Sequence, residues 1–257
     1  MTTVHLLRKE YYEKRKTILI YAAAYIVGII GIRLIFVHPA LHEEFYHSVL
    51  NFGLYLLGFI FASTCFSEIH QLARKHAWLM LPASAAEKLV VQVIIASLLF
   101  PIGLLLLTSG ASLIAELISQ VAYRESIRIF HPFSSEVGIR VLHFLVLSSL
   151  FLLGSAYFRK HQYIKTLLSL FAFGMLIALL GAVLARPFTY SFTEATVQLS
   201  IDSGIHSIPQ TTASSPSIVF FQAVGKLVQG AYWILLAPFC WLVTYLRLQE
   251  VEADDAV

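Results

Sequence analysis

Histidine and glutamate, two residue types that bind zinc in proteins, gather between positions 38 and 47. A His-Glu-x-x-His motif that starts at His42 would need its second histidine at position 46, but Tyr46 stands there. A Glu-Glu-x-x-x-Arg motif of intramembrane proteases fails as well, because Ser48 occupies the arginine position. We interpret this segment as a polar loop outside the membrane and keep a metal-dependent membrane hydrolase as the rival interpretation. The cluster consists of His38, His42, Glu43, Glu44 and His47.

Lys226 follows Gly225 and so resembles the end of a phosphate-binding loop. Such a loop needs a glycine five residues before Gly225, where Phe220 stands, and a hydroxyl residue after the lysine, where Leu227 stands. The sequence therefore predicts no nucleotide site, and it predicts no catalytic residue, metal site or cofactor in this chain. If ATP and Mg²⁺ drive its function, we expect another polypeptide to hold them.

Five further polar residues are candidates for a role at membrane depth, where a charged group is costly and needs a reason. Three of them, Glu136, Arg140 and His143, follow the i, i+4, i+7 spacing that places side chains on one helix face. That face would hold either a proton relay or an ion pair at the membrane surface. The candidates are Asn51, Glu116, Glu136, Arg140 and His143.

The composition indicates the class of protein that holds these residues in place. The chain has 257 residues, of which 58% are hydrophobic and 13% are charged, whereas soluble domains carry about 25% charged residues. The formal net charge is only +3 and the basic residues form small groups, so we expect no nucleic-acid partner. Cys65 and Cys240 lie in apolar runs and are expected to be buried thiols. These features predict an integral membrane protein that contacts the lipid bilayer.

Charged residues separate six apolar runs, each close to the roughly 20 residues that a membrane-spanning helix needs. The runs are continuous, which favours an all-α polytopic protein over a barrel. The first run lacks a small-residue cleavage site, so we interpret it as an uncleaved span. A single transmembrane domain, 1–257, is expected, with spans at about 17–37, 48–67, 89–112, 141–158, 166–185 and 227–246.

Lys and Arg are concentrated in the segments that lie on one side of these spans. The excess predicts that both termini are cytoplasmic. Pro101 is expected to kink the third span, which would bend or stop near Gly110 and leave 116–136 as an exterior segment. The connection 186–226 is expected to be an exterior loop, with a Ser/Thr/Pro-rich stretch at 207–217 and a re-entrant or interfacial helix at 218–225.

The connection between the second and third spans, 68–88, is more elaborate than a simple turn. Its part 69–81 has apolar residues on one face and is expected to form a short amphipathic helix. Ser84 precedes Glu87 by three residues, which predicts a capping box at the start of the third span. The amphipathic helix would either lie on lipid headgroups or dock on a partner.

Three segments together resemble the permease subunits of type-2 ABC exporters, especially compact bacterial six-span permeases that work with a separate ATPase. These segments are Arg8-Lys9-Glu10-Tyr11-Tyr12-Glu13-Lys14, Trp78-Leu79-Met80-Leu81-Pro82-Ala83-Ser84-Ala85-Ala86-Glu87-Lys88-Leu89 and Tyr245-Leu246-Arg247-Leu248-Gln249-Glu250-Val251-Glu252. The resemblance covers nearly the whole chain, although the Ser/Thr-rich stretch departs from the shortest members of the family.

The resemblance implies an amphipathic elbow helix at 6–16, a coupling helix at 69–81 and re-entrant exterior helices before the sixth span. It implies a cytosolic ABC ATPase dimer as partner, which would bind ATP and Mg²⁺, and a second permease copy or a sister permease. We expect Arg74, Lys75 and Glu87 to make polar contacts with the ATPase and Trp78 to anchor the contact. Peptide, lipid, drug and ion substrates stay open, as does a non-catalytic membrane scaffold or sensor.

Overall fold

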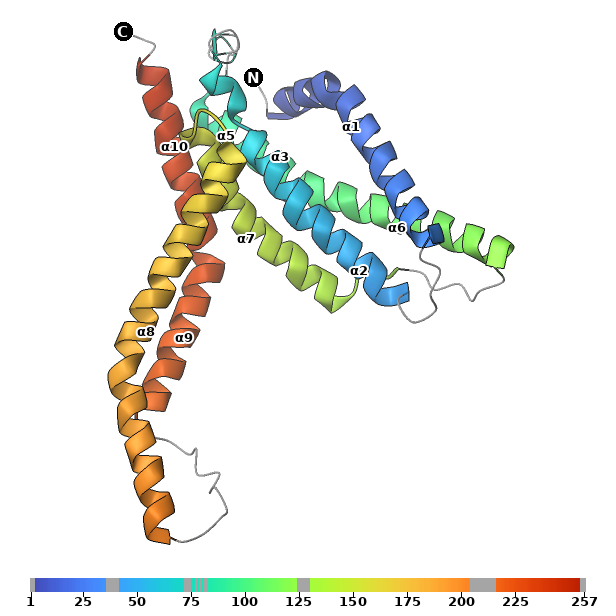
Figure 1. The fold of residues 1–257 in the computed structure, drawn as a ribbon. Helices are drawn as coiled ribbons and strands as arrows, with labels where there is room; N and C mark the ends of the chain where they lie inside the picture. Colours follow the sequence, from blue (N-terminus) through green and yellow to red (C-terminus); the bar gives the residue numbers. More distant parts are fainter. Residues whose placement is uncertain are drawn as a thin grey trace. The chain divides into compact units, whose positions relative to one another are not determined.

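The computed structural model describes residues 3–35, 42–71, 75–76, 78, 80, 83–123, 130–203 and 216–254. Within these residues the chain is helical and contains no strand. It divides into two compact units, Met1–Tyr163 with Leu236–Val257 (unit 1) and Ile164–Leu235 (unit 2) (Figure 1). All the contacts that matter for the candidate site lie in unit 1.

The first span is part of one long helix, α1 (Thr3–Ile35), whose first turns lie at an angle to the rest (Figure 1). The membrane-length apolar part of α1 covers Arg15–Ile35, as expected from the sequence. The basic segment before it is continuous with the span in one helix, and an elbow at 6–16 stays a prediction.

The second span is helical throughout but contains a π segment in its middle. It comprises α2 (His42–Phe52), the π-helix η2 (Gly53–Leu57) and α3 (Gly58–Thr64), and a short 3₁₀ helix, η3 (Ser67–His70), follows it. Gly58 is a point of close approach, because a Cβ atom there would collide with the ring of Phe144. The missing side chain lets α3 pack directly on the fourth span.

The third span also contains a π segment, which ends two residues before Pro101, the site of the predicted kink. The span consists of α5 (Ala85–Val93), the π-helix η4 (Ile94–Leu99) and α6 (Phe100–Tyr123). Pro101 has no N–H for the carbonyl of Ser97 four residues earlier, which favours a wider turn at this point. The helix does not end near Gly110, so Glu116 lies within α6 and not in an exterior segment as expected.

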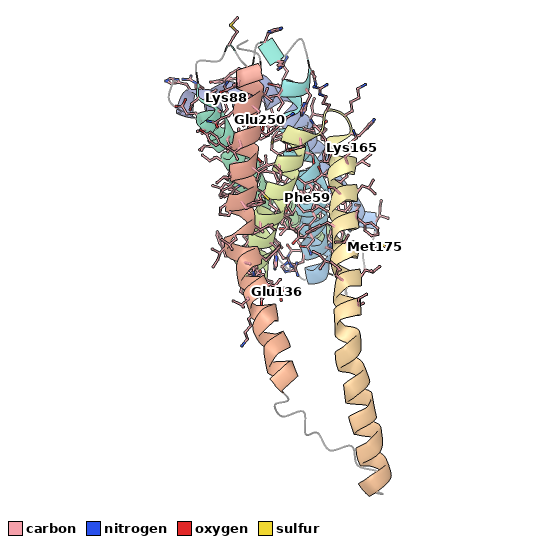
Figure 2. All side chains as sticks on the ribbon, turned by 90° about the vertical axis from the view of Figure 1, so that its left-hand side faces the viewer. Phe59, Lys88, Glu136, Lys165, Met175 and Glu250 are labelled. Carbon is pink, nitrogen blue, oxygen red and sulfur yellow. The ribbon has the colours of Figure 1, made fainter. Side chains whose placement is uncertain are left out.

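Helices α7 (Ser135–Tyr157) and α10 (Leu236–Asp254) complete unit 1, and α10 packs along α7. Ser134 caps α7 by accepting a hydrogen bond from the Val137 N–H at 3.3 Å. The ends of unit 1 carry charge, since Lys88 and Glu250 lie at one end, Glu136 at the other, and Phe59 between them (Figure 2). The buried core consists of Ile29, Tyr46, Leu50, Leu54, Leu104, Ala111, Phe130, Val137 and Phe144.

Unit 2 holds most of α8 (Gln162–Ser203) and all of α9 (Pro216–Ile234). Helix α8 continues well beyond the expected end of the fifth span, so the first part of the expected loop 186–226 is helical. The expected re-entrant segment 218–225 lies inside α9, and a break at Leu235 interrupts the expected span 227–246. Of the Ser/Thr-rich stretch, residues 207–215 lie outside the described residues.

Five helices in the described part of the chain are long and apolar enough to cross a membrane. The interrupted pair Gly225–Ile234 and Leu236–Ala253 would provide a sixth crossing if it is counted as one span. The side chains of 171–183 on α8 are all exposed, and most of them are apolar, as in a helix surface that faces lipid. These features indicate an integral membrane protein, as the composition predicts.

Candidate functional site

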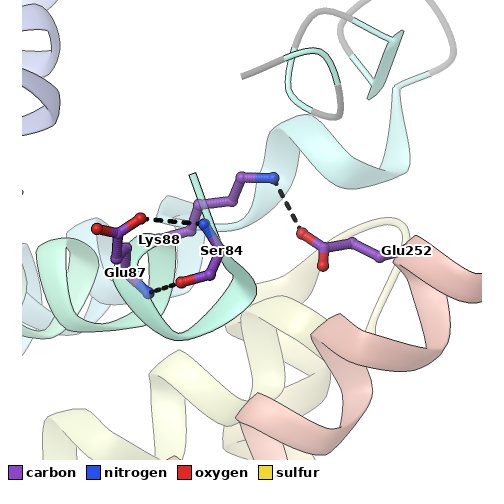
Figure 3. A network of polar contacts seen from close by, with 4 residues as sticks. All are labelled: Ser84, Glu87, Lys88 and Glu252. Atoms are coloured by element: carbon purple, nitrogen blue, oxygen red, sulfur yellow. Dashed lines mark hydrogen bonds and ion pairs between the residues drawn. The ribbon is translucent and has the colours of Figure 1, made fainter. Parts of the chain in front are cut away.

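A polar network ties the start of α5 to the last turns of α10 (Figure 3). The Lys88 ammonium donates a hydrogen bond to Glu252 Oε1 at 2.9 Å and lies 4.1 Å from the centre of the Trp78 ring. Lys88 is only 5% exposed and Trp78 only 7%. We call this group, together with Ser84 and Glu87, the terminal network, because it lies near the end of the last helix.

The start of α5 is fixed by the capping box that the sequence predicts. The Glu87 N–H donates to Ser84 Oγ at 3.2 Å, and the Ser84 N–H donates to Glu87 Oε2 at 3.1 Å (Figure 3). These two bonds satisfy backbone donors that the first turn of a helix would otherwise leave open. Lys88 follows directly on the helix, so the capping box sets the direction of its side chain.

A third helix joins the terminal network, which we take to include Gln92 and Glu10, because Gln92 Nε2 donates to Glu10 Oε1 of α1 at 3.5 Å. Gln92 lies one turn after Lys88 on α5. The first turns of α1 and the last turns of α10 therefore lie at the same end of unit 1, which we call the terminal end. A displacement of the Trp78–Lys88 segment would act on α1, α5 and α10 together.

Burial makes the Lys88 contacts energetically important. A buried ammonium without a partner costs several kcal/mol, and a desolvated cation over an aromatic ring gains about 2 kcal/mol. The Lys88–Glu252 pair is asymmetric, because the side chain of Lys88 is 4% exposed and that of Glu252 is 32% exposed. The network therefore holds α10 against α5 while Glu252 stays accessible from solvent.

A second junction at the terminal end centres on His70 in η3. The Ser155 carbonyl of α7 is 3.0 Å from His70 Nε2 and accepts a hydrogen bond from Gln162 Nε2 at 3.2 Å. Burial lowers the pKa of His70 most strongly, the hydrogen bond with the Ser155 carbonyl raises it by a smaller amount, and the positive charges of Arg159 and Arg247 each lower it again. The imidazole is therefore favoured in its neutral form.

The opposite end of unit 1 contains a buried ion pair. Arg33 Nε of α1 donates to Glu116 Oε1 of α6 at 3.1 Å, and the Tyr46 hydroxyl of α2 donates to the same oxygen at 2.8 Å. The side chains of Arg33 and Glu116 are 2% and 1% exposed. We call these three residues the clasp. It joins the first three spans through one carboxylate.

The other polar candidates lie on α7 and α2. Arg140 donates to Glu136 Oε2 at 3.3 Å, which confirms that these two residues share a face of α7, and Glu136 is exposed. His143 lies one turn further on the same helix. Asn51 lies on α2, and its Oδ1 atom is buried without a hydrogen-bond partner among the described residues. The proton relay stays a prediction.

The four residues expected to contact an ATPase all belong to the segment before α5 or to its first turn. Arg74 lies outside the described residues. The Lys75 N–H donates to the Gln71 carbonyl at 2.8 Å, which is a helical turn. Trp78 and Glu87 make contacts within the chain, to Lys88 and Ser84. A role of these residues in partner binding stays a prediction, and in the structure Trp78 is buried and packs on the Lys88 ammonium.

Of the His/Glu cluster, His38 lies outside the described residues, and only the backbone of 42–44 is described, in the first turn of α2. The ring of His47 packs against that of Phe130, with the centroids 5.3 Å apart. Among the side chains that the structure describes, no three His, Cys, Asp or Glu residues are grouped closely enough to hold a metal ion.

Sequence reasoning did not find the roles of Arg33, Tyr46, Lys88 and Glu252. Arg33 had a signal, because Arg33 and Glu116 are single opposite charges within apolar runs, whereas Lys88 and Glu252 stand among other charged residues. A single charge buried in a membrane span needs a partner. Two opposite single charges in different spans are therefore expected to form an ion pair. Tyr46 had no such signal, since tyrosine near a span end also fits a membrane-surface position.

Comparison of the chain with protein-family models, with curated proteins and with solved structures finds no match.

Proposed function

We propose that the chain is the membrane subunit of an ATP-driven ABC exporter, in which a separate ATPase supplies the energy. The observation that carries the proposal is the terminal network. It fixes the segment between the second and third spans to α5 and α10 through Lys88, Glu252 and Trp78. A partner that pushes on this segment would therefore move membrane helices directly, which is the property that a coupling segment needs.

In this proposal the terminal end faces the cytoplasm, and both chain termini lie there. The excess of Lys and Arg in the segments assigned to that side supports this orientation. An ATPase dimer that binds ATP and Mg²⁺ would contact the segment 69–81 from the cytoplasm. A second copy of the chain, or a sister chain, would complete the pathway, as in the permeases that the sequence resembles.

The coupling role is tested with Lys88→Met, which removes the charge but keeps most of the apolar stem. After co-purification with its ATPase and reconstitution, we expect this variant to retain basal ATP hydrolysis and to lose the stimulation of hydrolysis by substrate. Glu252→Gln should show the same loss in a weaker form, because Glu252 is partly solvated. Lys160→Met is the matched control, since Lys160 is exposed. Normal stimulation in Lys88→Met would overturn the coupling role.

A further inference from the structure

Three polar contacts tie α1 to the third span along its whole length. Glu10 contacts Gln92, Tyr25 Oη lies 3.0 Å from Thr108 Oγ1, and Arg33 contacts Glu116. The residue numbers rise together in both helices, so α1 and the third span run parallel. The sequence separation is 82 at Glu10 and 83 at both Tyr25 and Arg33. The register therefore changes by one residue between the first contact and the second.

The π segment η4 (Ile94–Leu99) lies between Gln92 and Thr108 and accounts for this change. The Phe100 N–H bonds to the Ile95 carbonyl, which is the i to i−5 pattern of a π turn. A π turn holds one more residue than an α turn in nearly the same length. The extra residue aligns Thr108 and Glu116, and not their predecessors, with their partners on α1.

Relaxation of η4 to an α-helix would change these contacts in a defined way. With α5 fixed, α6 would rotate by about 100°, because an α-helix has 3.6 residues per turn. The separation of 82 would then continue along the whole helix. Tyr25 would lie opposite Leu107 instead of Thr108, and Arg33 would lie opposite Ala115 instead of Glu116. The buried guanidinium would lose its carboxylate, so the clasp opposes this rotation.

We propose that η4 is a two-state register switch in the third span and that the Arg33–Glu116–Tyr46 clasp holds it in the π form. Release of the clasp allows η4 to become α-helical and α6 to rotate against α1. This inference goes beyond the proposed function, because the two states belong to this chain alone and do not depend on which partner drives it. Its test accordingly needs no ATPase.

The experiment measures which residue of α6 faces position 25 of α1. Cysteine pairs are placed at Tyr25→Cys with Thr108→Cys, or at Tyr25→Cys with Leu107→Cys, in the full chain with Cys65→Ala and Cys240→Ala. The proteins are treated in membranes with a short bifunctional thiol reagent. We expect the Thr108→Cys pair to crosslink in the otherwise unchanged chain. Addition of Glu116→Gln should shift crosslinking to the Leu107→Cys pair.

Deletion of Ile95 separates the switch from a general loosening of the helices. The deletion turns η4 into an α-helix but keeps the alignment of α6 with α1, so Thr108→Cys should crosslink even when Glu116→Gln is present.

Glu136→Gln is the matched control, because it removes an exposed carboxylate from α7 and should cause no shift. If Glu116→Gln fails to fold, Tyr46→Phe weakens the clasp more gently and should cause a partial shift. Crosslinking that stays at Thr108→Cys in both clasp variants would overturn the proposal, as would a shift that the deletion does not prevent.

Discussion

At the scale of single residues, the clasp is the most demanding feature of the chain. Two opposite charges have been taken out of water, and their attraction in a low-dielectric interior offsets the desolvation only when the hydrogen bonds are well placed. The Tyr46 hydroxyl adds one of these bonds at 2.8 Å. The charges of Arg33 and Glu116 are therefore dependent on each other, and neither is expected to be tolerated alone.

Removal of one member of the pair should destabilise the protein strongly. We expect Arg33→Met or Glu116→Leu to lower the free energy of unfolding by about 3–5 kcal/mol, because each leaves a buried charge without its partner. The double variant should cost clearly less than the sum of the two. Denaturant unfolding in detergent micelles measures all three values. Additive losses would show that the two side chains contribute independently and would contradict the ion-pair account.

His70 predicts a dependence of stability on pH. Its pKa is lowered in the folded protein, mainly by burial, so the unfolded state takes up a proton more readily. The stability that neutral His70 contributes to the folded state is complete above a pH of about 6.5, the ordinary pKa of histidine. It is lost as the pH falls through the lowered pKa of the folded state. We expect the thermal unfolding temperature to fall between pH 7.5 and 5.5, and to fall less in His70→Gln.

The matched control for this measurement is His76→Gln, because His76 is exposed. It should leave the pH dependence unchanged. An equal pH dependence in the natural chain and in His70→Gln would assign the effect to other groups.

At the scale of elements, glycine positions separate close helix contacts from open ones. A Cβ atom at Gly58 would meet the rings of Phe144 and Phe100, whereas one at Gly103 would have nothing within 4 Å. Gly58→Ala should therefore cost about 1–3 kcal/mol through overpacking of α3 against α7. Gly103→Ala should be neutral or stabilising by up to about 1 kcal/mol, because alanine favours the helix. Unfolding measurements that rank the two variants the other way would contradict the packing of α3.

The elements that the sequence predicted well are those with a local cause. The first, second and fourth spans follow from apolar runs between charges, and the capping box follows from Ser84 and Glu87. The continuation of α6 past Gly110 was not predicted, because a glycine that ends a helix in water is tolerated where no water competes for the backbone. The two π segments depend on packing between helices and had no signal beyond Pro101.

At the scale of the whole molecule, the two polar sites lie at opposite ends of unit 1. The terminal network joins α1, α5 and α10, and the clasp joins α1, α2 and α6. The sequence predicted only some of their members, because contacts between residues 70 or more positions apart depend on how the helices pack. Helix α1 takes part in both sites, so it connects the segment proposed to meet the ATPase with the far end of the bundle.

The proposed orientation is tested by labelling of single cysteines in intact cells. With Cys65→Ala and Cys240→Ala as background, we expect a membrane-impermeant thiol reagent to leave Lys160→Cys unmodified and to label Phe133→Cys. Both positions are exposed, and they lie at opposite ends of α7. Labelling of Lys160→Cys with no labelling of Phe133→Cys would show the opposite orientation. The coupling segment would then lie outside the cytoplasm.

We propose that this chain works with a separate ATPase, and co-purification shows whether such a partner is bound. The tagged chain is extracted from its native host in mild detergent, and the proteins that accompany it are identified and quantified by mass spectrometry. The account predicts an ATPase with a Walker loop in near-equal amount, and a reduced amount with variants of the segment 69–81. A chain that purifies without any ATPase, under conditions that keep other membrane complexes intact, would contradict the account.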